Sequence, residues 1–141
     1  MRIEIVNKTK SSIPRQQLLK LCHLIEKEER PPDSSINIIF IGDQRMKRLN
    51  QDYRGISKST DVLSFNMDNG LRDGDVFGEI YISTEMAARY AKSDKMGRNE
   101  MVLKLCCHGY LHLLGYDHKR AKDRKAMEEK EEFYLKKALR Q

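Results

Sequence analysis

The sequence predicts an α+β domain with four strands and about five helices. Short β-branched runs typical of strands occur at four places, and longer segments repeat apolar residues at the helical period. The two kinds of segment do not alternate strictly, which indicates an α+β sheet domain. At 141 residues and 16.5 kDa, the chain fits one domain over residues 1–141 better than two, and it is long enough to bury a core.

The first half of the chain predicts two strands and two helices. Residues 2–7 alternate apolar and polar side chains as a strand does, and Pro14 opens a helix that runs to about residue 29. After a double proline, the dense β-branched run at residues 36–41 is typical of an interior strand. Asp43 is expected to cap the next helix, which continues to about residue 53.

The second half predicts two short strands and three helices. A polar loop at residues 54–61 leads into the first strand, and a loop rich in Asp, Asn and Gly leads into the second. Ser83 is expected to cap the helix that follows. We expect the strands at residues 62–65 and 79–82, a helix to about residue 94, a buried central helix at residues 98–114 and an amphipathic helix at residues 120–139.

Composition predicts a folded cytoplasmic protein that does not span a membrane. Hydrophobic residues make up 39% and charged residues 34% of the chain, and no apolar run approaches the roughly 20 residues of a bilayer span. The first residues lack the continuous apolar stretch of a secretory signal. Cys22, Cys106 and Cys107 form an odd set without a CxxC pair, which favours buried thiols in a reducing compartment. The net charge of +6 favours an anionic partner such as nucleic acid.

Three of the four histidines fall within the segment HGYLHLLGYDH. His108 and His112 are four residues apart, so on a helix both imidazoles lie on one face and can bind one metal ion. His118 would point away if the helix continued, but Gly115 stands where a left-handed residue ends a helix and returns the chain. Three imidazoles without a thiolate predict a catalytic zinc ion, one per chain, or another divalent metal with an open position. The alternative is a set of core or helix-capping histidines.

The spacing HxxxHxxGxxH matches the metzincin zinc proteases except at one position. Those enzymes carry a glutamate general base directly after the first histidine, where this chain has Gly109. A glycine inside a helix costs about 1 kcal/mol relative to alanine. Two explanations account for a glycine at this position. One is close approach by a strand, a metal site or a substrate, and the other is simple tight packing.

The same histidine segment resembles the signature of the YbeY-type rRNA maturation factors, which are metal-dependent, single-strand-specific endoribonucleases of bacteria. Two further blocks resemble that family in the expected order, LNQDYRG followed by STDVLSF, and then GEIYIS. The resemblance covers nearly the whole chain. It implies a mixed four-stranded sheet and a zincin-like central helix that carries the metal ligands.

Carried over by position, the resemblance implies His108, His112 and His118 as the metal ligands and Arg54 as a functionally important arginine. Thr60, Asp61 and Ser64 match further motif positions. Two departures from the family pattern, Glu79 and the pair Cys106-Cys107, remove no ligand and bear on packing.

The resulting hypothesis is an endoribonuclease that hydrolyses phosphodiester bonds in single-stranded RNA. The resemblance implies a role in rRNA maturation at the 16S rRNA 3′ end and in ribosome quality control, with rRNA and the ribosome or ribosomal proteins as partners. Arg54 would hold a phosphate and stabilise developing charge, and Asp117 would orient a histidine or accept a proton from water. The alternatives are a surface arginine and a turn-stabilising aspartate.

Several other readings of the sequence stay open. Tyr53, Phe65 and Tyr116 are either base-stacking side chains or core and rim aromatics, and His23 is interpreted as a tolerated helix residue. A small zinc metalloprotease is one rival function. The other is a non-enzymatic ribosome assembly factor in which the metal is structural.

Overall fold

The computed structural model describes residues 2–31, 35–67, 76–117 and 119–140. Its elements alternate only in part between strands and helices, as the sequence predicts. In chain order they are β1 (Arg2–Asn7), α1 (Arg15–Glu29), β2 (Ser35–Ile41), α2 (Asp43–Arg54), β3 (Val62–Asn66), β4 (Val76–Ser83), α3 (Thr84–Ser93), α4 (Arg98–Leu113) and α5 (Ala121–Leu139).

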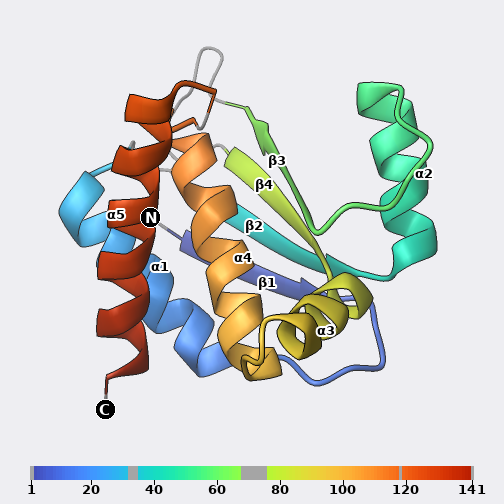
Figure 1. Ribbon diagram of the computed structural model, residues 1–141, viewed down its shortest axis with the longest axis horizontal. Helices are drawn as coiled ribbons and strands as arrows, with labels where there is room; N and C mark the ends of the chain where they lie inside the picture. The colour runs from blue at the N-terminus through green and yellow to red at the C-terminus, as the bar shows by residue number, and fades with distance from the viewer. Residues whose placement is uncertain (1, 32–34, 68–75, 118, 141) are drawn as a thin grey trace.

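The four strands form one mixed sheet in the order β1-β2-β4-β3 (Figure 1). β2 is parallel to both β1 and β4, whereas β3 pairs antiparallel with β4 at the edge. All residues of β2 except Asn37 are buried, as expected for an interior strand covered on both faces. The predicted mixed α+β sheet is therefore confirmed.

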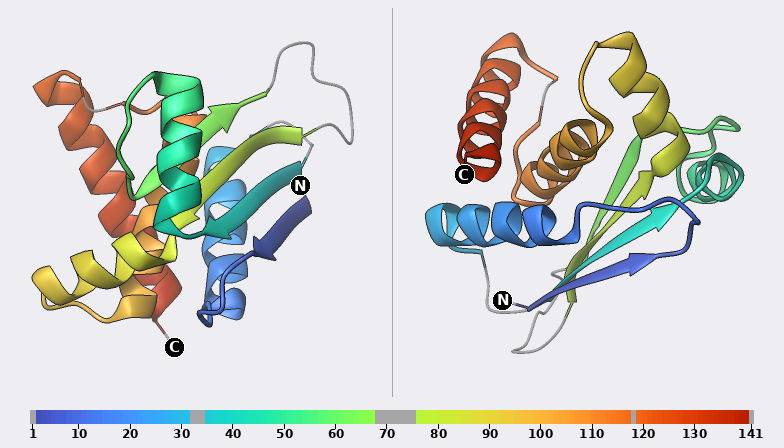
Figure 2. Two further views of the ribbon diagram at one scale, coloured as in Figure 1. Left: turned by 90° about the vertical axis from the view of Figure 1, so that its right-hand side faces the viewer. Right: turned by 90° about the horizontal axis from the view of Figure 1, so that it is seen from below.

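Helices cover the two faces of the sheet unequally. α1, α4 and α5 lie together on one face, and α2 lies on the other, near β3 and β4 (Figure 2). α4 runs through the middle of the larger helical layer, and ten of its sixteen residues are buried. α3 packs against α4. The predicted buried central helix is confirmed, and all three cysteines are buried and free of disulfides.

The element boundaries agree with the sequence except at two places. β4 begins at Val76, three residues before the expected start, because Val76 and Gly78 pair with the first residues of β2. The prediction that Asp43 caps α2 is wrong: Gly42 occupies the N-cap position without a side-chain hydrogen bond. The Asp43 carboxylate instead accepts hydrogen bonds from more distant side chains, described below. Ser83 does cap α3, by accepting a hydrogen bond from the Met86 backbone N–H at 3.2 Å.

Among the described residues, none of the helices is both long enough and apolar enough to cross a lipid bilayer.

Candidate active site

A close contact between α4 and the sheet sets the position of the site. A Cβ atom built on Gly109 would lie 2.8 Å from Ile80 Cγ2, 2.9 Å from Ser64 Oγ and 3.1 Å from Val62 Cγ2. Such distances are too short for a side chain, so only glycine lets α4 approach β3 and β4 this closely. Of the two readings left open for Gly109, the structure shows close approach by strands.

Two side chains of β3 hold α4 at this short distance. The Ser64 hydroxyl donates a hydrogen bond to the Gly109 carbonyl at 2.9 Å, and the Asn66 amide donates to the Leu113 carbonyl at 2.9 Å. Leu113 is the last residue of α4, so Asn66 satisfies a carbonyl that has no partner within the helix. The edge strand and the last turn of α4 are thereby fixed to each other.

His108 and His112 meet on one face of α4, as their spacing predicts. Their Nε2 atoms are 3.1 Å apart, and their ring centroids are 4.7 Å apart at an interplanar angle of 76°. Both residues lie near the carboxyl end of the helix, where the helix dipole favours a cation. The two Nε2 atoms are thus within hydrogen-bonding distance of each other, and both histidines line the same groove.

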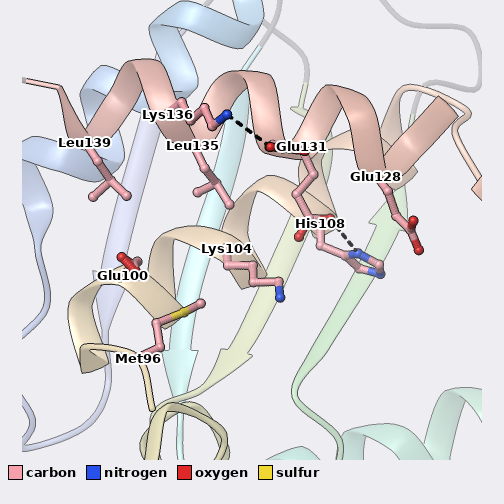
Figure 3. Close-up of a pocket in the computed structure, with 10 residues that line it drawn as sticks. Met96, Glu100, Lys104, His108, Glu128, Glu131, Leu135, Lys136 and Leu139 are labelled. Carbon is pink, nitrogen blue, oxygen red and sulfur yellow. Dashed lines mark hydrogen bonds and ion pairs between the residues drawn. The ribbon is translucent and has the colours of Figure 1, made fainter. Parts of the chain in front are cut away.

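Glu131 of α5 orients the ring of His108 by contacting Nδ1, the ring nitrogen that does not face His112 (Figure 3). Its Oε2 atom lies 3.3 Å from His108 Nδ1, and the glutamate is buried. Because an ionised carboxylate only accepts hydrogen bonds, the neutral tautomer that satisfies this contact carries its proton on Nδ1 and a lone pair on Nε2. Sequence reasoning missed Glu131, although it continues the apolar stripe of α5 at the spacing Met127, Glu131, Tyr134, and a charged residue on a buried stripe is a usable signal.

The paired imidazoles fit the family's expected metal ion in donor chemistry and in spacing. Two nitrogens bound to one zinc ion at tetrahedral angles are about 3.3 Å apart, given Zn–N distances of about 2.0–2.1 Å. The separation of 3.1 Å between the Nε2 atoms is close to that value. A carboxylate on the far nitrogen is the usual outer partner of a metal-binding histidine.

α4 ends at the predicted glycine. Gly115 has φ +101°, its N–H donates to the His112 carbonyl at 3.0 Å, and the Tyr116 N–H donates to the Leu111 carbonyl at 3.1 Å. This pair of hydrogen bonds is the Schellman termination that reverses the chain after a helix. The expected third ligand, His118, lies outside the described residues.

The residues just before position 118 are held by other contacts. Asp117 Oδ1 accepts a hydrogen bond from the Lys119 N–H at 2.7 Å, which is the turn-stabilising role considered as an alternative. The Tyr116 hydroxyl donates to Glu29 Oε1 at 2.8 Å, and the Tyr134 hydroxyl donates to Glu29 Oε2. Tyr116 is thus tied to the carboxyl end of α1 and to α5.

The Glu29 carboxylate binds both tyrosine hydroxyls and also contacts a lysine. Lys130 Nζ lies 3.4 Å from Glu29 Oε2 and adds a positive charge. Burial alone would raise the pKa of Glu29, but hydrogen bonds from Tyr134 and Tyr116 and the charge of Lys130 lower it below its usual value. Burial and this carboxylate raise the pKa of Tyr116 to about 12. Glu29 therefore stays ionised at neutral pH and keeps both tyrosines as donors.

Arg54 and the two histidines line the same groove. This groove, which we call the β3 groove, has a volume of about 610 Å³ and lies between α4, β3 and the end of α2. Its lining residues are Arg54, Thr60, Asp61, Val62, Leu63, Ser64, Asn66, His108, His112 and Leu113. The groove brings together Arg54, His108 and His112 of the predicted site.

The loop from α2 to β3 forms one wall of the β3 groove and is anchored by Asp43. Its Oδ1 atom accepts hydrogen bonds from Ser59 at 3.0 Å and Ser83 at 2.8 Å, and its Oδ2 lies 2.6 Å from an Arg89 nitrogen. Burial alone would raise the pKa of Asp43, but the contacts with Ser83, Arg89 and Ser59 lower it. Within the loop, Asp61 Oδ1 accepts from the Val62 N–H at 2.8 Å, which starts β3.

A second groove lies on the other side of His108, between α4 and α5 (Figure 3). This α5 groove has a volume of about 590 Å³, an apolar part formed by three side chains and a rim that carries four glutamates. Its lining residues are Met96, Glu100, Lys104, His108, Glu128, Glu131, Glu132, Leu135, Lys136 and Leu139. His108 thus separates two grooves of different charge.

No group of three His, Cys, Asp or Glu side chains placed to hold a metal ion occurs in the described ranges 2–31, 35–67, 76–117 and 119–140. The described part of the predicted site is a pair of imidazoles with a carboxylate behind one of them and a guanidinium in the same groove.

Comparison with known proteins decides the family. The family model described as Endoribonuclease YbeY matches residues 4–139. The chain belongs to the YbeY family. Among curated YbeY endoribonucleases, that of Desulforamulus reducens is 39% identical, covering 93% of this chain and 94% of its own. That of Chlorobium phaeovibrioides is 35% identical, covering 96% and 89%.

A solved structure supports the same YbeY fold. The solution structure of TM1509 from Thermotoga maritima is 31% identical to this chain, with a TM-score of 0.67. The match covers 96% of this chain and 88% of that one. The predicted family is therefore confirmed, and the mixed sheet under a layer of helices is shared with an experimentally determined structure.

Proposed function

We propose that this protein is a metal-dependent endoribonuclease that cleaves single-stranded RNA. Membership in the YbeY endoribonuclease family supports the coarse activity, a hydrolase that cuts RNA internally. The observation that carries the finer proposal is the convergence of His108 Nε2 and His112 Nε2, 3.1 Å apart, in the groove that Arg54 also lines. A single RNA substrate in this groove could therefore contact both a metal ion held by the histidines and the Arg54 guanidinium.

His108, His112 and His118 would hold one divalent ion, with zinc as the proposed metal. When bound, the ion supplies Lewis-acid stabilisation of charge at the scissile phosphate. Glu131 keeps the Nδ1 proton of His108 in place and so keeps the Nε2 lone pair available. The tie between Tyr116 and Glu29 limits movement of the chain just before position 118.

Arg54 would bind the scissile phosphate directly. Its guanidinium stays charged at every physiological pH and can donate two parallel hydrogen bonds to phosphate oxygens. Charge on those oxygens increases toward the transition state, so the guanidinium would stabilise the transition state more than the bound substrate. We propose that Asp117 also accepts a proton from water during the reaction, in addition to accepting the hydrogen bond from the Lys119 N–H.

Gly109 argues against the protease alternative. The backbone at this position packs against Ile80, Ser64 and Val62, so a glutamate general base could not replace the glycine without displacing these side chains. The helix position that supplies a carboxylate in metzincins is used here for contact with the sheet.

The test is cleavage of an unstructured RNA and, separately, of casein by the purified protein, with and without a chelator. We expect RNA cleavage that the chelator abolishes and that added divalent metal restores, and no cleavage of casein. Casein cleavage would establish the protease instead. Intact RNA together with a chelator-dependent loss of thermal stability would establish a structural metal in a non-enzymatic factor.

We further propose that the natural substrate is rRNA, that cleavage matures the 16S rRNA 3′ end in the cytoplasm, and that the protein acts with the ribosome or ribosomal proteins, including in ribosome quality control. This part rests on the family resemblance and on the net charge of +6, which suits a polyanionic partner. Cells that carry only the Arg54→Glu variant should accumulate 3′-extended 16S rRNA. Normal 16S rRNA ends in those cells would contradict the proposed substrate.

A further inference from the structure

Tyr53 is an aromatic side chain that the mechanism above does not use. It lies on the side of α2 that packs on the sheet, one helical turn beyond the buried residue Asn50 and two beyond buried Met46. Yet 69% of Tyr53 is exposed, whereas the other exposed large apolar side chains in the described part of the chain range from 37% to 45%. A position that normally buries its side chain therefore presents an open ring.

The ring of Tyr53 is supported from beneath. It contacts Phe65 of β3 in a tilted geometry, with an interplanar angle of 58° and 5.0 Å between the ring centroids, and Phe65 meets Tyr81 of β4 edge-on at 5.8 Å. The Tyr81 hydroxyl is held in turn by Glu79 at 3.2 Å, which gives a function in packing to this departure from the family pattern. Three aromatic rings thus form a continuous cluster whose outermost ring is open to solvent.

This aromatic cluster lies beside the β3 groove, across the edge of the sheet. Side chains alternate along β3, so Ser64 and Asn66 face α4 while Phe65 faces the opposite side. β3 is the edge strand, and Arg54, the residue after Tyr53, lines the groove on the α4 side. Because Tyr53 and Arg54 are consecutive residues, a polymer held at Arg54 would come close to the Tyr53 ring if it left the groove over this edge.

The charge of α2 suits an anionic polymer. Its exposed positions carry Arg45, Lys47, Arg48 and Arg54 and one acidic residue, Asp52. The α5 groove, on the far side of His108, has four glutamates among its lining residues. A phosphodiester strand would therefore follow α2 rather than α5.

We propose that the exposed face of Tyr53 is a nucleobase-binding subsite, which stacks an unpaired base of a nucleotide that flanks the phosphate bound by Arg54. The proposal rests on the proposed RNA-cleaving function and extends it to the substrate. Every base presents a π-face, so this subsite accepts any sequence but only unpaired bases. It gives a physical reason for a preference for single strands, because a base within a duplex has no free face to offer.

The alternative role for Tyr53 is to shield Phe65 from water, and a set of variants separates the two roles. Leucine at position 53 still covers Phe65 but lacks a π-face, whereas phenylalanine and tryptophan keep one. We expect Tyr53→Leu to raise KM for an unstructured oligonucleotide by between about 5- and 150-fold, the range for loss of one base–aromatic stack. Tyr53→Phe and Tyr53→Trp should stay within about 3-fold of the parent, and all three variants should keep the parent melting temperature.

Tyr53→Trp also gives a direct readout of contact. The chain contains no tryptophan, so this variant carries a single indole fluorophore. Stacking of a base on the indole should quench its fluorescence when decauridylate is mixed in and read before turnover. The matched control is Tyr90→Trp on α3, where the parent tyrosine is 40% exposed and has no place in the groove; its fluorescence should not change.

The possible outcomes distinguish failure of the proposed base-binding subsite from failure of the proposed RNA-cleaving activity. If the parent cleaves RNA but Tyr53→Leu has an unchanged KM, or the indole at position 53 is not quenched, the subsite is wrong and the nuclease assignment stands. If the parent cleaves no RNA, the proposed function fails. Quenching at position 53 and not at position 90 would then still establish base contact.

Discussion

The two grooves that meet at His108 have similar volumes, but only the α5 groove has more acidic than basic side chains in its lining. The β3 groove presents Arg54 and the Nε2 atoms of both histidines, with Asp61 as its one carboxylate. The α5 groove presents four glutamates, two lysines and an apolar floor. The same imidazole is thus held by a carboxylate on its α5 side and faces, on its β3 side, a groove whose charged residues are one arginine and one aspartate. Under the proposed function, the α5 side would orient His108 for the metal ion and the β3 side would receive the phosphate.

The largest effect on activity, with the protein still folded, is expected from reversing the charge in the β3 groove. Arg54→Glu removes the guanidinium proposed to bind the phosphate and puts a repelling carboxylate in its place, so kcat/KM should fall by at least about 10²–10³-fold. Metal content should not change, since Arg54 is not a proposed ligand. RNA cleavage rates give kcat/KM, and metal analysis of the same preparation gives the metal content.

The matched control makes the same charge change in the α5 groove. Lys136→Glu replaces an exposed lysine that pairs with Glu132 at 3.1 Å. We expect a change in kcat/KM of less than about 3-fold, because exposed ion pairs contribute little. Equal losses in both variants would mean that the two grooves do not differ in function.

The next effect tests whether the α5 side orients His108. Glu131→Gln keeps the shape of the side chain but weakens its hydrogen bond with Nδ1, so metal affinity should fall by about 10–100-fold. Chelator competition measures this affinity. Glu128→Gln, an exposed neighbour in the same groove, should leave it unchanged. If the two variants bind metal alike, Glu131 has no role in the metal centre.

A smaller effect, on stability, tests the contact that forms the β3 groove. In Gly109→Ala the new methyl group would overlap Ile80 and Ser64, at a cost of about 1–3 kcal/mol. Alanine has a better helix propensity than glycine, which offsets up to about 1 kcal/mol of this cost. We therefore expect the free energy of unfolding, measured in urea, to fall by about 1–2 kcal/mol. A Cβ at Gly97, the N-cap of α4, meets nothing within 4 Å, so Gly97→Ala should cost only the N-cap preference for glycine, about 0.5 kcal/mol. A stable Gly109→Ala would mean that α4 does not need this approach.

The smallest effect concerns the loop that forms the outer wall of the β3 groove. The pKa of Asp43 is lowered in the folded state, so its contribution to stability is complete above the unfolded value of 3.8 and disappears as pH falls through the lower folded value. Asp43→Asn should therefore lose about 1 kcal/mol at pH 7 and approach the parent below about pH 4. Asp52→Asn, exposed on the same helix, is the control. A loss that does not depend on pH would contradict an ionic role for Asp43.

Local sequence patterns predicted the elements and the pairing of His108 with His112, because helix period and glycine termination act over a few residues. Gly115 ends α4 as expected, and Ser83 caps α3. The prediction failed at Asp43 because its partners lie 16, 40 and 46 residues away in the chain, so no local pattern could show that they compete for the carboxylate.

The same reason limits the prediction of the site. Glu131 is 23 residues from His108, and the contact depends on how α5 packs against α4. The reason for Gly109 lies in Ile80 and Ser64, which only the folded sheet brings beneath the helix. The exposure of Tyr53 depends on where α2 meets the edge of the sheet, although its helical spacing predicts burial.

Metal content of the protein, purified without added metal and without chelator, tests the histidine site most directly. We predict about one divalent ion per folded chain, and its loss together with RNA cleavage in His112→Ala and in His118→Ala. The His23→Ala variant, changed at an exposed position on α1, should keep the ion. A parent protein without bound metal that still cleaves RNA, or a full complement of metal in both histidine variants, would contradict a centre built on His108, His112 and His118.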